Sequence, residues 1–229
     1  AAQNVVKFAG TTATVTAAAA DGTSLTVTVP AGVTTGGTIT IDYAGVTLTT
    51  GSYTVVATPT LTSLSSTNVA VTGTIYINGT NFSTTATDNV VKFGGVTATV
   101  TNATATQLTV TVPAGISSGN LTLTYAGVTL TTPYNLVTAP TLTSFTPSVV
   151  AVGGTVTITG TNFSTTAANN VVRFNGTAAT VTAAAADGTS LTVTVPSGVT
   201  AGTITIAYAG ITLTTSAYTV VPTPTLTGF

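Results

Sequence analysis

Apolar and polar residues alternate over many short stretches of the chain. In residues 24–29 Leu and Val alternate with Ser and Thr, and residues 155–159 and 203–208 repeat the pattern with Val, Ile and Thr. A period of two places the apolar side chains on one face of a β-strand, and β-branched residues suit that conformation. Gly-containing turn dipeptides follow these stretches. The alternation predicts short strands joined by tight turns, and the AAAA runs at Ala17 and Ala183, too short to sustain a helix, are predicted to be loops or edges.

Three landmarks recur along the chain at intervals of about 83 residues. They are TVTVP, ending at Pro30, Pro113 and Pro196; YAG, starting at Tyr43, Tyr125 and Tyr208; and PTLT, starting at Pro59, Pro140 and Pro224. A period of this size is that of a small domain and not of a solenoid repeat. It predicts a domain at residues 1–57 that lacks its first two strands, complete domains at 58–138 and 139–222, and the first strand of a following domain at 223–229. We interpret these ends as cuts from a longer repetitive chain, with strand exchange between copies as the alternative.

Each repeat contains about seven predicted strands. In the third repeat the first four lie at residues 140–148, 154–163, 170–176 and 177–182, and SLTVTVP, GTITIAYAG and ITLTTSAYTVV follow. Seven short strands with regular turns are typical of an immunoglobulin-like sandwich. The predicted fold class is therefore all-β, built as tandem immunoglobulin-like β-sandwiches.

The order of the motifs also resembles a known family. PTLTSFTPS, GTVTITGTNF, NVVRFNG, LTVTVP, GTITI and a closing YTV follow one another as in the IPT/TIG domain. The resemblance covers nearly the whole chain and implies immunoglobulin-like modules of the kind found in plexin-type receptors, Rel-type transcription factors and many bacterial surface proteins. It implies a location at the cell surface or outside the cell. Because one module serves several functions, the resemblance identifies the fold better than the function.

Charged side chains are scarce, which argues against several functions. The chain has three basic and four acidic residues among 229, with no His and no Cys. Catalysis needs a general base, a nucleophile or a metal, so we expect neither an enzyme nor a cofactor. Lys7, Lys92 and Arg173 cannot neutralise enough phosphates to bind nucleic acid, and they are predicted to be outward, solvated charges. Thr, Gly or Pro interrupts every apolar run, so we expect no membrane insertion.

The acidic and amide residues are weak candidates for sites. Calcium would need several oxygen ligands together, but Asp42 is isolated, and Asp21 and Asp187 each stand in the turn dipeptide Asp-Gly. Asn-x-Ser/Thr triplets leave glycosylation open, although Asn81 and Asn162 are predicted to be semi-buried. Ranks of Thr leave an ice-binding surface as a minor alternative.

The near-neutral surface leads to the main functional hypothesis. Only 3% of the residues are charged, and such surfaces associate readily. The links between repeats contain Pro and no Gly or Ser run, which predicts stiff joints. We hypothesise a structural extracellular repeat protein that forms a filament, stalk or surface layer, with copies of itself as partners. The alternative is an adhesin or glycan-binding module with a glycan as partner.

Two sets of residues bear on this choice. The aromatic residues expected to face the core, and so to be unavailable to a glycan, are Phe8, Tyr43, Phe93, Tyr125, Phe174 and Tyr208. The candidate inter-domain or subunit contacts lie at the start of each repeat: Pro59, Thr60, Leu61, Pro140, Thr141, Leu142, Pro224, Thr225 and Leu226.

Overall fold

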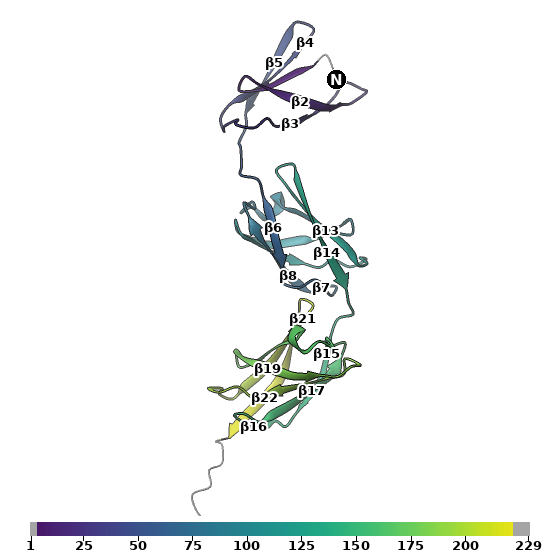
Figure 1. Ribbon diagram of the computed structural model, residues 1–229, viewed down its shortest axis with the longest axis vertical. Helices are drawn as coiled ribbons and strands as arrows, with labels where there is room; N and C mark the ends of the chain where they lie inside the picture. The colour runs from purple at the N-terminus through teal and green to yellow at the C-terminus, as the bar shows by residue number, and fades with distance from the viewer. Residues whose placement is uncertain (1–3, 222–229) are drawn as a thin grey trace, which may run out of the picture. The chain divides into compact units, whose positions relative to one another are not determined.

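The chain is built from strands throughout the part that the structure describes. The computed structural model describes residues 4–221 and divides into two compact units, Ala1–Ala57 and Thr58–Phe229 (Figure 1). Apart from strands, these residues form two single 3-10 turns, η1 (Ala86–Asp88) and η2 (Ala167–Asn169). Within this range no helix is long and apolar enough to cross a membrane. The predicted all-β class is confirmed.

The first half of Thr58–Phe229 is a sandwich of two sheets. Its strands are β6 (Thr60–Leu64), β7 (Asn68–Val69), β8 (Thr74–Thr80), β9 (Val90–Phe93), β10 (Val96–Thr97), β11 (Thr99–Ala103), β12 (Gln107–Thr111), β13 (Gly119–Tyr125) and β14 (Val128–Leu136). One sheet has the order β11-β12-β8-β6 and the other β10-β9-β13-β14-β7. We call this sandwich module 2.

The second half, module 3, repeats the arrangement. Its strands are β15 (Thr141–Thr146), β16 (Val149–Ala151), β17 (Thr155–Thr161), β18 (Val171–Phe174), β19 (Thr177–Ala184), β20 (Ser190–Thr194), β21 (Gly202–Tyr208) and β22 (Ile211–Val221). The ladder runs continuously as β15-β17-β20-β19-β18-β21-β22-β16, because β19 pairs with both β18 and β20. The strand β19 includes Ala183 and Ala184, so half of the Ala run predicted as a loop or edge is strand.

The first predicted strand of module 3 is divided in the structure. Residues 140–148 were expected to form one strand, but β15 ends at Thr146 and β16 begins at Val149. Pro147 lies between them, and a proline has no N–H with which to continue a ladder. The strand β15 pairs antiparallel with β17, whereas β16 pairs parallel with β22. Because of this break, one stretch of chain supplies β15 to the edge beside β17 and β16 to the edge beside β22.

The alternating pattern builds the cores as expected. In β17, Val156 and Ile158 are fully buried while the Thr residues between them are exposed. The predicted inward positions of Phe93 and Phe174 are confirmed. The expectation for the YAG tyrosines was wrong for Tyr43, which is 51% exposed, whereas the other two are half-buried. Each of these tyrosines is the last residue of its strand.

The buried aromatic pairs use other tyrosines. Phe93 packs edge-to-face on Tyr134, and Phe174 on Tyr218, with ring centroids 5.0 and 5.2 Å apart. The Tyr134 hydroxyl donates to the Ser117 carbonyl at 2.6 Å. Burial raises the pKa of the Tyr134 and Tyr218 phenols above 10.0. Their contribution to stability is therefore complete below pH 10.0 and is lost as the pH rises through the folded pKa.

The first unit offers a matched comparison for this hydroxyl. Tyr53 packs on Phe8 in the same way, but its buried hydroxyl has no partner among the described residues. We expect Tyr134→Phe to lower the free energy of unfolding of module 2 by about 1 kcal/mol, because the Ser117 carbonyl loses its donor. Tyr53→Phe should leave its unit unchanged or stabilise it, because it removes an unpaired polar atom. Hydrogen exchange, which resolves each module, measures both, and equal losses would contradict the account.

The GTNF motif closes the start of each complete module. A Cβ on Gly160 would lie 2.0 Å from the Thr141 carbonyl oxygen, so only glycine allows β15 and β17 to approach there. Asn162 adopts a positive φ of 56°, and its side-chain nitrogen donates to the Ala139 carbonyl at 3.0 Å. Phe163 is buried beside this glycine. Asn162 and its counterpart Asn81 are exposed and not semi-buried, because their amides reach out to the linker.

The unit Ala1–Ala57 is a smaller sheet. Its strands are β1 (Val5–Phe8), β2 (Thr11–Ala18), β3 (Leu25–Thr28), β4 (Thr38–Tyr43) and β5 (Val46–Ser52), in the order β3-β2-β1-β4-β5. Its buried hydrophobic residues among those described are few: Val6, Phe8 and Ala13. As in module 3, the first strand after the turn continues into the Ala run, here to Ala18.

One ion pair corrects the expectation for Lys7. Lys7 Nζ lies 3.0 Å from the Asp42 carboxylate, so Lys7 is paired and is not a free solvated charge. A hydrogen bond from Thr47, together with Lys7, lowers the pKa of Asp42. Both partners are about one-third exposed, and such pairs contribute little to stability. Lys92 and Arg173 are exposed, as predicted.

Candidate functional site

The predicted contact residues lie at the start of the first strand of their own modules. Pro59 and Pro140 are buried, and Leu61 and Leu142 pack against the core of modules 2 and 3, respectively. The Thr60 and Thr141 hydroxyls pair with Thr80 and Thr161 across the adjacent strand, at 2.8 and 2.7 Å. Pro224, Thr225 and Leu226 lie outside the described residues. A role of these nine residues in contacts between subunits stays a prediction.

Within Thr58–Phe229, the hydrogen bonds between modules 2 and 3 come from a different element. The turn between β21 and β22 carries Ala209 and Gly210 at φ of 54° and 81°, as a tight hairpin turn requires. The Ala70 N–H donates to the Ala209 carbonyl at 2.9 Å, and the Thr74 N–H donates to the Gly210 carbonyl at 2.8 Å. The YAG turn of module 3 is therefore held by the backbone of module 2.

Two glycines permit this close approach. A Cβ on Gly73 would lie 2.7 Å from the Ala209 carbonyl oxygen, and a Cβ on Gly210 would lie 2.8 Å from the Thr74 carbonyl oxygen. The corresponding Gly127, in the YAG turn of module 2, has no heavy atom within 4 Å of such a Cβ. Gly154, the counterpart of Gly73 in module 3, meets only its own turn, at Ala151. Gly73 also meets its own turn, at 2.8 Å from the Ala70 carbonyl oxygen, so the crowding that belongs to the docked turn is that of Gly73 against Ala209 and of Gly210 against Thr74.

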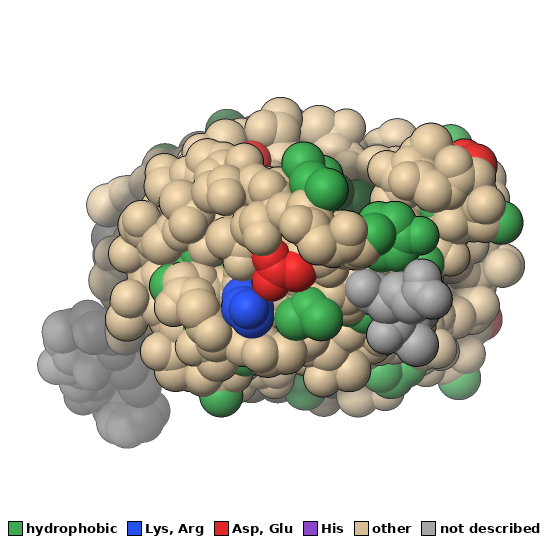
Figure 2. All heavy atoms as spheres, turned by 90° about the horizontal axis from the view of Figure 1, so that it is seen from above, with side chains coloured by type: hydrophobic (Ala, Val, Ile, Leu, Met, Phe, Trp, Pro, Cys, Tyr) green, Lys and Arg blue, Asp and Glu red, His purple; other side chains and the backbone are tan. Residues whose placement is uncertain are grey.

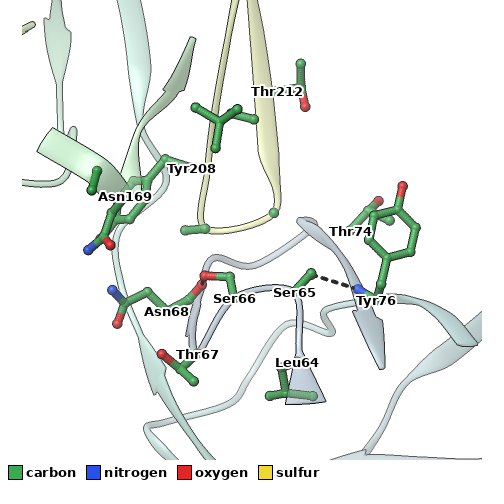
Figure 3. Close-up of a pocket in the computed structure, with 15 residues that line it drawn as sticks. Leu64, Ser65, Ser66, Thr67, Asn68, Thr74, Tyr76, Asn169, Tyr208 and Thr212 are labelled. Carbon is green, nitrogen blue, oxygen red and sulfur yellow. Dashed lines mark hydrogen bonds between the residues drawn. The ribbon is translucent and has the colours of Figure 1, made fainter. Parts of the chain in front are cut away.

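A groove of about 660 Å³ follows the docked turn. It is lined from module 2 mainly by residues 64–68, Thr74 and Tyr76, and from module 3 by residues around Asn169 and by the YAG turn itself. The side chains seen in Figure 3 are hydroxyls, amides, aromatic rings and small apolar groups. None of the lining residues is charged. The groove is therefore suited to an uncharged polar ligand and not to a phosphate or a metal ion.

Local hydrogen bonds hold the groove residues in place. The Tyr76 N–H donates to Ser65 Oγ at 2.9 Å, which fixes the start of β8 against the loop before β7 (Figure 3). In module 3 the buried Asn170 accepts from the Ser164 N–H at 3.0 Å and donates to its carbonyl at 2.9 Å. This bracing supports η2, which ends at Asn169. These hydrogen bonds therefore fix the backbone segments that line the groove.

Two aromatic rings and two amides, those of Tyr76, Tyr208, Asn68 and Asn169, line the groove. Tyr208 and Asn169 lie on one side of the hairpin turn, and Tyr76 lies on the other (Figure 3). Tyr76 is 43% exposed, in an outward position where module 3 has Thr157. The sequence-based interpretation overlooked Tyr76, although a tyrosine replacing the repeat's threonine on an outward face was a usable signal.

The surface elsewhere has few charges. Figure 2 shows one face on which red and blue side chains are rare among neutral polar groups and scattered apolar patches. Across residues 4–221, there is no group of three or more His, Cys, Asp or Glu placed to hold a metal ion. Asp21 and Asp187 each accept from the N–H and the hydroxyl of the threonine two residues on, which lowers their pKa and serves the turn.

The fold defines the chain as a set of tandem immunoglobulin-like sandwich modules. The IPT/TIG domain matches residues 59–138 and 140–221, and the chain therefore belongs to the IPT/TIG family. The expected resemblance is confirmed. No curated protein matches the chain.

Several solved structures are similar at low identity. SGBP-B from a complex xyloglucan utilization locus in Bacteroides uniformis is 22% identical, over 71% of this chain and 49% of that chain, with a TM-score of 0.33. SGBP-B of the Bacteroides ovatus mixed-linkage glucan utilization locus, in complex with a mixed-linkage heptasaccharide, is 17% identical over 97% and 61%, with a TM-score of 0.32. The plexin A4 extracellular region is 21% identical over 72% and 16%, with a TM-score of 0.39. The chain spans less than two thirds of each of these proteins.

Proposed function

We propose that the chain is a non-catalytic spacer of a cell-surface protein, in which docked modules hold a fixed distance or orientation. The observation that carries the proposal is the docked YAG turn, held by the Ala70 and Thr74 N–H groups at 2.9 and 2.8 Å. Two modules joined only by a flexible linker would not have to form backbone hydrogen bonds with each other. The linker adds to it, because the Asn162 amide ties the Ala139 carbonyl to module 3 just before Pro140. A stalk, filament or surface layer would use the same property.

The test of the spacer is the distance between two labels, one in each module of Thr58–Phe229. A docked pair gives one distance, whereas tethered modules give many. Association of copies through uncharged faces, the other part of the original hypothesis, stays a prediction that light scattering at high concentration checks.

A second function, binding of a neutral glycan, is favoured by the groove at the same junction. Aromatic rings stack on sugar faces, and amides and hydroxyls exchange hydrogen bonds with sugar hydroxyls. Tyr76 and Asn68 are the residues that support this reading, because module 3 has Thr157 and Val149 at the equivalent positions. Groove residues that differ between the repeats are more typical of a ligand-binding site than of a scaffold, in which each repeat would keep the same residues.

This second function predicts a specific loss on substitution. If the chain binds a neutral oligosaccharide, Tyr76→Thr should weaken binding by roughly tenfold, because a stacked ring is lost. Tyr125→Thr is the matched control, since that tyrosine lies outside the groove residues. Calorimetry with neutral glucan and xyloglucan oligosaccharides measures both variants. Binding that Tyr76→Thr leaves unchanged would place the glycan elsewhere, and no binding would remove this candidate.

A further inference from the structure

The outer face of one sheet of module 2 differs from the same face of module 3. In the sheet β11-β12-β8-β6, residues that alternate with the buried ones point away from the core. At four outward positions where module 3 has Thr157, Thr159, Ala183 and Ser190, module 2 has one tyrosine and three amides. These residues are Tyr76, Asn78, Asn102 and Gln107. We call them the amide patch.

The register of the strands brings the amide patch together. Asn102 on β11 lies opposite Thr109 on β12, and Thr109 lies opposite Tyr76 on β8. Gln107 lies opposite Asn78 in the next outward row of β12 and β8. Because neighbouring strands are about 4.8 Å apart and outward residues on one strand about 7 Å apart, the patch is roughly 10 Å across. All the differences between the two faces therefore lie at one place.

Hydrogen bonds hold two of the amides in a row across the strands. The Gln107 side-chain nitrogen donates to Asn78 Oδ1 at 2.9 Å, and the Asn78 side-chain nitrogen donates to Ser63 Oγ at 3.2 Å. An amide group has two N–H donors and an oxygen that accepts two hydrogen bonds, so each keeps donors and acceptors that these bonds do not use. Asn102 is exposed beside them. The patch thus presents donors and acceptors in fixed positions.

The chemistry of the amide patch suits a neutral ligand rich in hydroxyl groups. None of its residues is charged, and its one aromatic ring, that of Tyr76, is 43% exposed. A protein partner would need an apolar centre, which one ring among amides does not supply. Amides exchange hydrogen bonds with sugar hydroxyls, and an aromatic ring stacks on the apolar face of a sugar. Tyr76 also lines the groove between modules 2 and 3, so the patch and the groove are continuous (Figure 3).

We infer that the amide patch extends the groove into one binding site for the linear chain of a neutral polysaccharide. Tyr76 stacks on a sugar at the margin of the groove, and Asn78, Asn102 and Gln107 form hydrogen bonds with the sugars beyond it. The inference rests on the glycan-binding function proposed for the groove. It adds the residues that make the site prefer a long chain to a short one.

Two neutral glucan oligosaccharides test the inference by calorimetry on the full 229-residue chain. A trisaccharide has the size of ligand that a groove of about 660 Å³ holds, and an octasaccharide reaches past Tyr76. The triple variant Asn78→Thr, Asn102→Ala, Gln107→Ser gives the patch the residues of module 3, which the same fold already accepts. The control is Asn120→Thr, the same kind of exchange at an exposed position on the other sheet of module 2. Hydrogen exchange of β8 and β12 checks that each variant is folded.

We expect the unchanged chain to bind the octasaccharide at least roughly tenfold more tightly than the trisaccharide. The triple variant should lose this preference and keep its affinity for the trisaccharide, whereas Asn120→Thr should change neither affinity. Should the triple variant be unfolded, Gln107→Ser alone, at an exposed position, should weaken octasaccharide binding by about threefold.

Three results would overturn the inference. Equal affinities of the unchanged chain for the two sugars, or a preference that the triple variant keeps, would leave the groove as the whole site. Equal weakening of both sugars by the triple variant would mean that the amides act on the groove and not beyond it. Binding of neither sugar would remove the glycan function itself, and the amide patch with it.

Discussion

Gly160→Ala is expected to destabilise module 3 by about 3 kcal/mol. The added Cβ would lie 2.0 Å from the Thr141 carbonyl oxygen and 2.6 Å from the Phe163 ring. The ring could move, but the carbonyl belongs to a backbone strand paired with β17. Relief would require separating β15 from β17 or expelling the phenylalanine from the core.

The control for this substitution is Gly51→Ala. Gly51 also lies in a strand, β5, and a Cβ there meets no heavy atom within 4 Å. Alanine in an unobstructed strand position should be neutral or stabilise the unit by about 0.5 kcal/mol, because glycine loses more entropy on folding. Hydrogen exchange in urea measures the free energy of unfolding for each module. A loss for Gly160→Ala no greater than for Gly51→Ala would contradict the close packing of β15 and β17.

Gly210→Ala is expected to release the docked turn. The added methyl would lie 2.8 Å from the Thr74 carbonyl oxygen and 3.0 Å from its nitrogen, the atom that donates to the Gly210 carbonyl. The two backbone hydrogen bonds between modules 2 and 3 would be lost together, because one turn makes both. Each module should stay folded, module 3 losing only the conformational cost of alanine in the turn, while the distance between the two modules becomes broadly distributed.

Gly127→Ala separates this effect from strain in the turn itself. Gly127 and Gly210 have φ of 79° and 81°, so alanine carries the same conformational cost at both. Within Thr58–Phe229, Gly210 faces the other module, whereas a Cβ on Gly127 meets nothing within 4 Å. The Gly127→Ala variant should therefore keep the narrow distance distribution. Equal broadening in both variants would mean that turn strain, and not docking, determines the result.

The strands and the period of the fold could be predicted because they depend on local patterns. Alternation of Val and Ile with Thr decides which face of β17 is buried, and it does so within a few residues. The same logic held only in part for Tyr208, which continues the inward phase of the fully buried Ile204 and Ile206 but is itself only half-buried. That position is the last of β21, where the sandwich ends and a neighbouring module begins. The core ends at this position, and the alternation of apolar and polar residues along a single strand does not show where the core ends.

The junction could be predicted only in part for a similar reason. The Ala-Gly dipeptide of the YAG landmark predicted a turn, because glycine in such a dipeptide is a turn signal by itself. Its contact with Ala70 and Gly73 depends on the path of the linker and on two close approaches between segments far apart in the sequence. Pro59 and Pro140 were predicted to be inter-domain contacts because they lie in the linkers between repeats. They are buried in their own modules, and the docking surface lies elsewhere.

The most direct test of the docked junction is a distance between spin labels in modules 2 and 3. The chain has no native cysteine, so Thr101→Cys on β11 and Thr182→Cys on β19, both exposed, give two unambiguous labels. A pair within module 3, at Thr157→Cys and Thr182→Cys, sets the width expected for a rigid body. We predict one distance between modules with a distribution as narrow as that of the control pair. A distribution several times broader, unchanged by Gly210→Ala, would show tethered modules and would contradict the spacer.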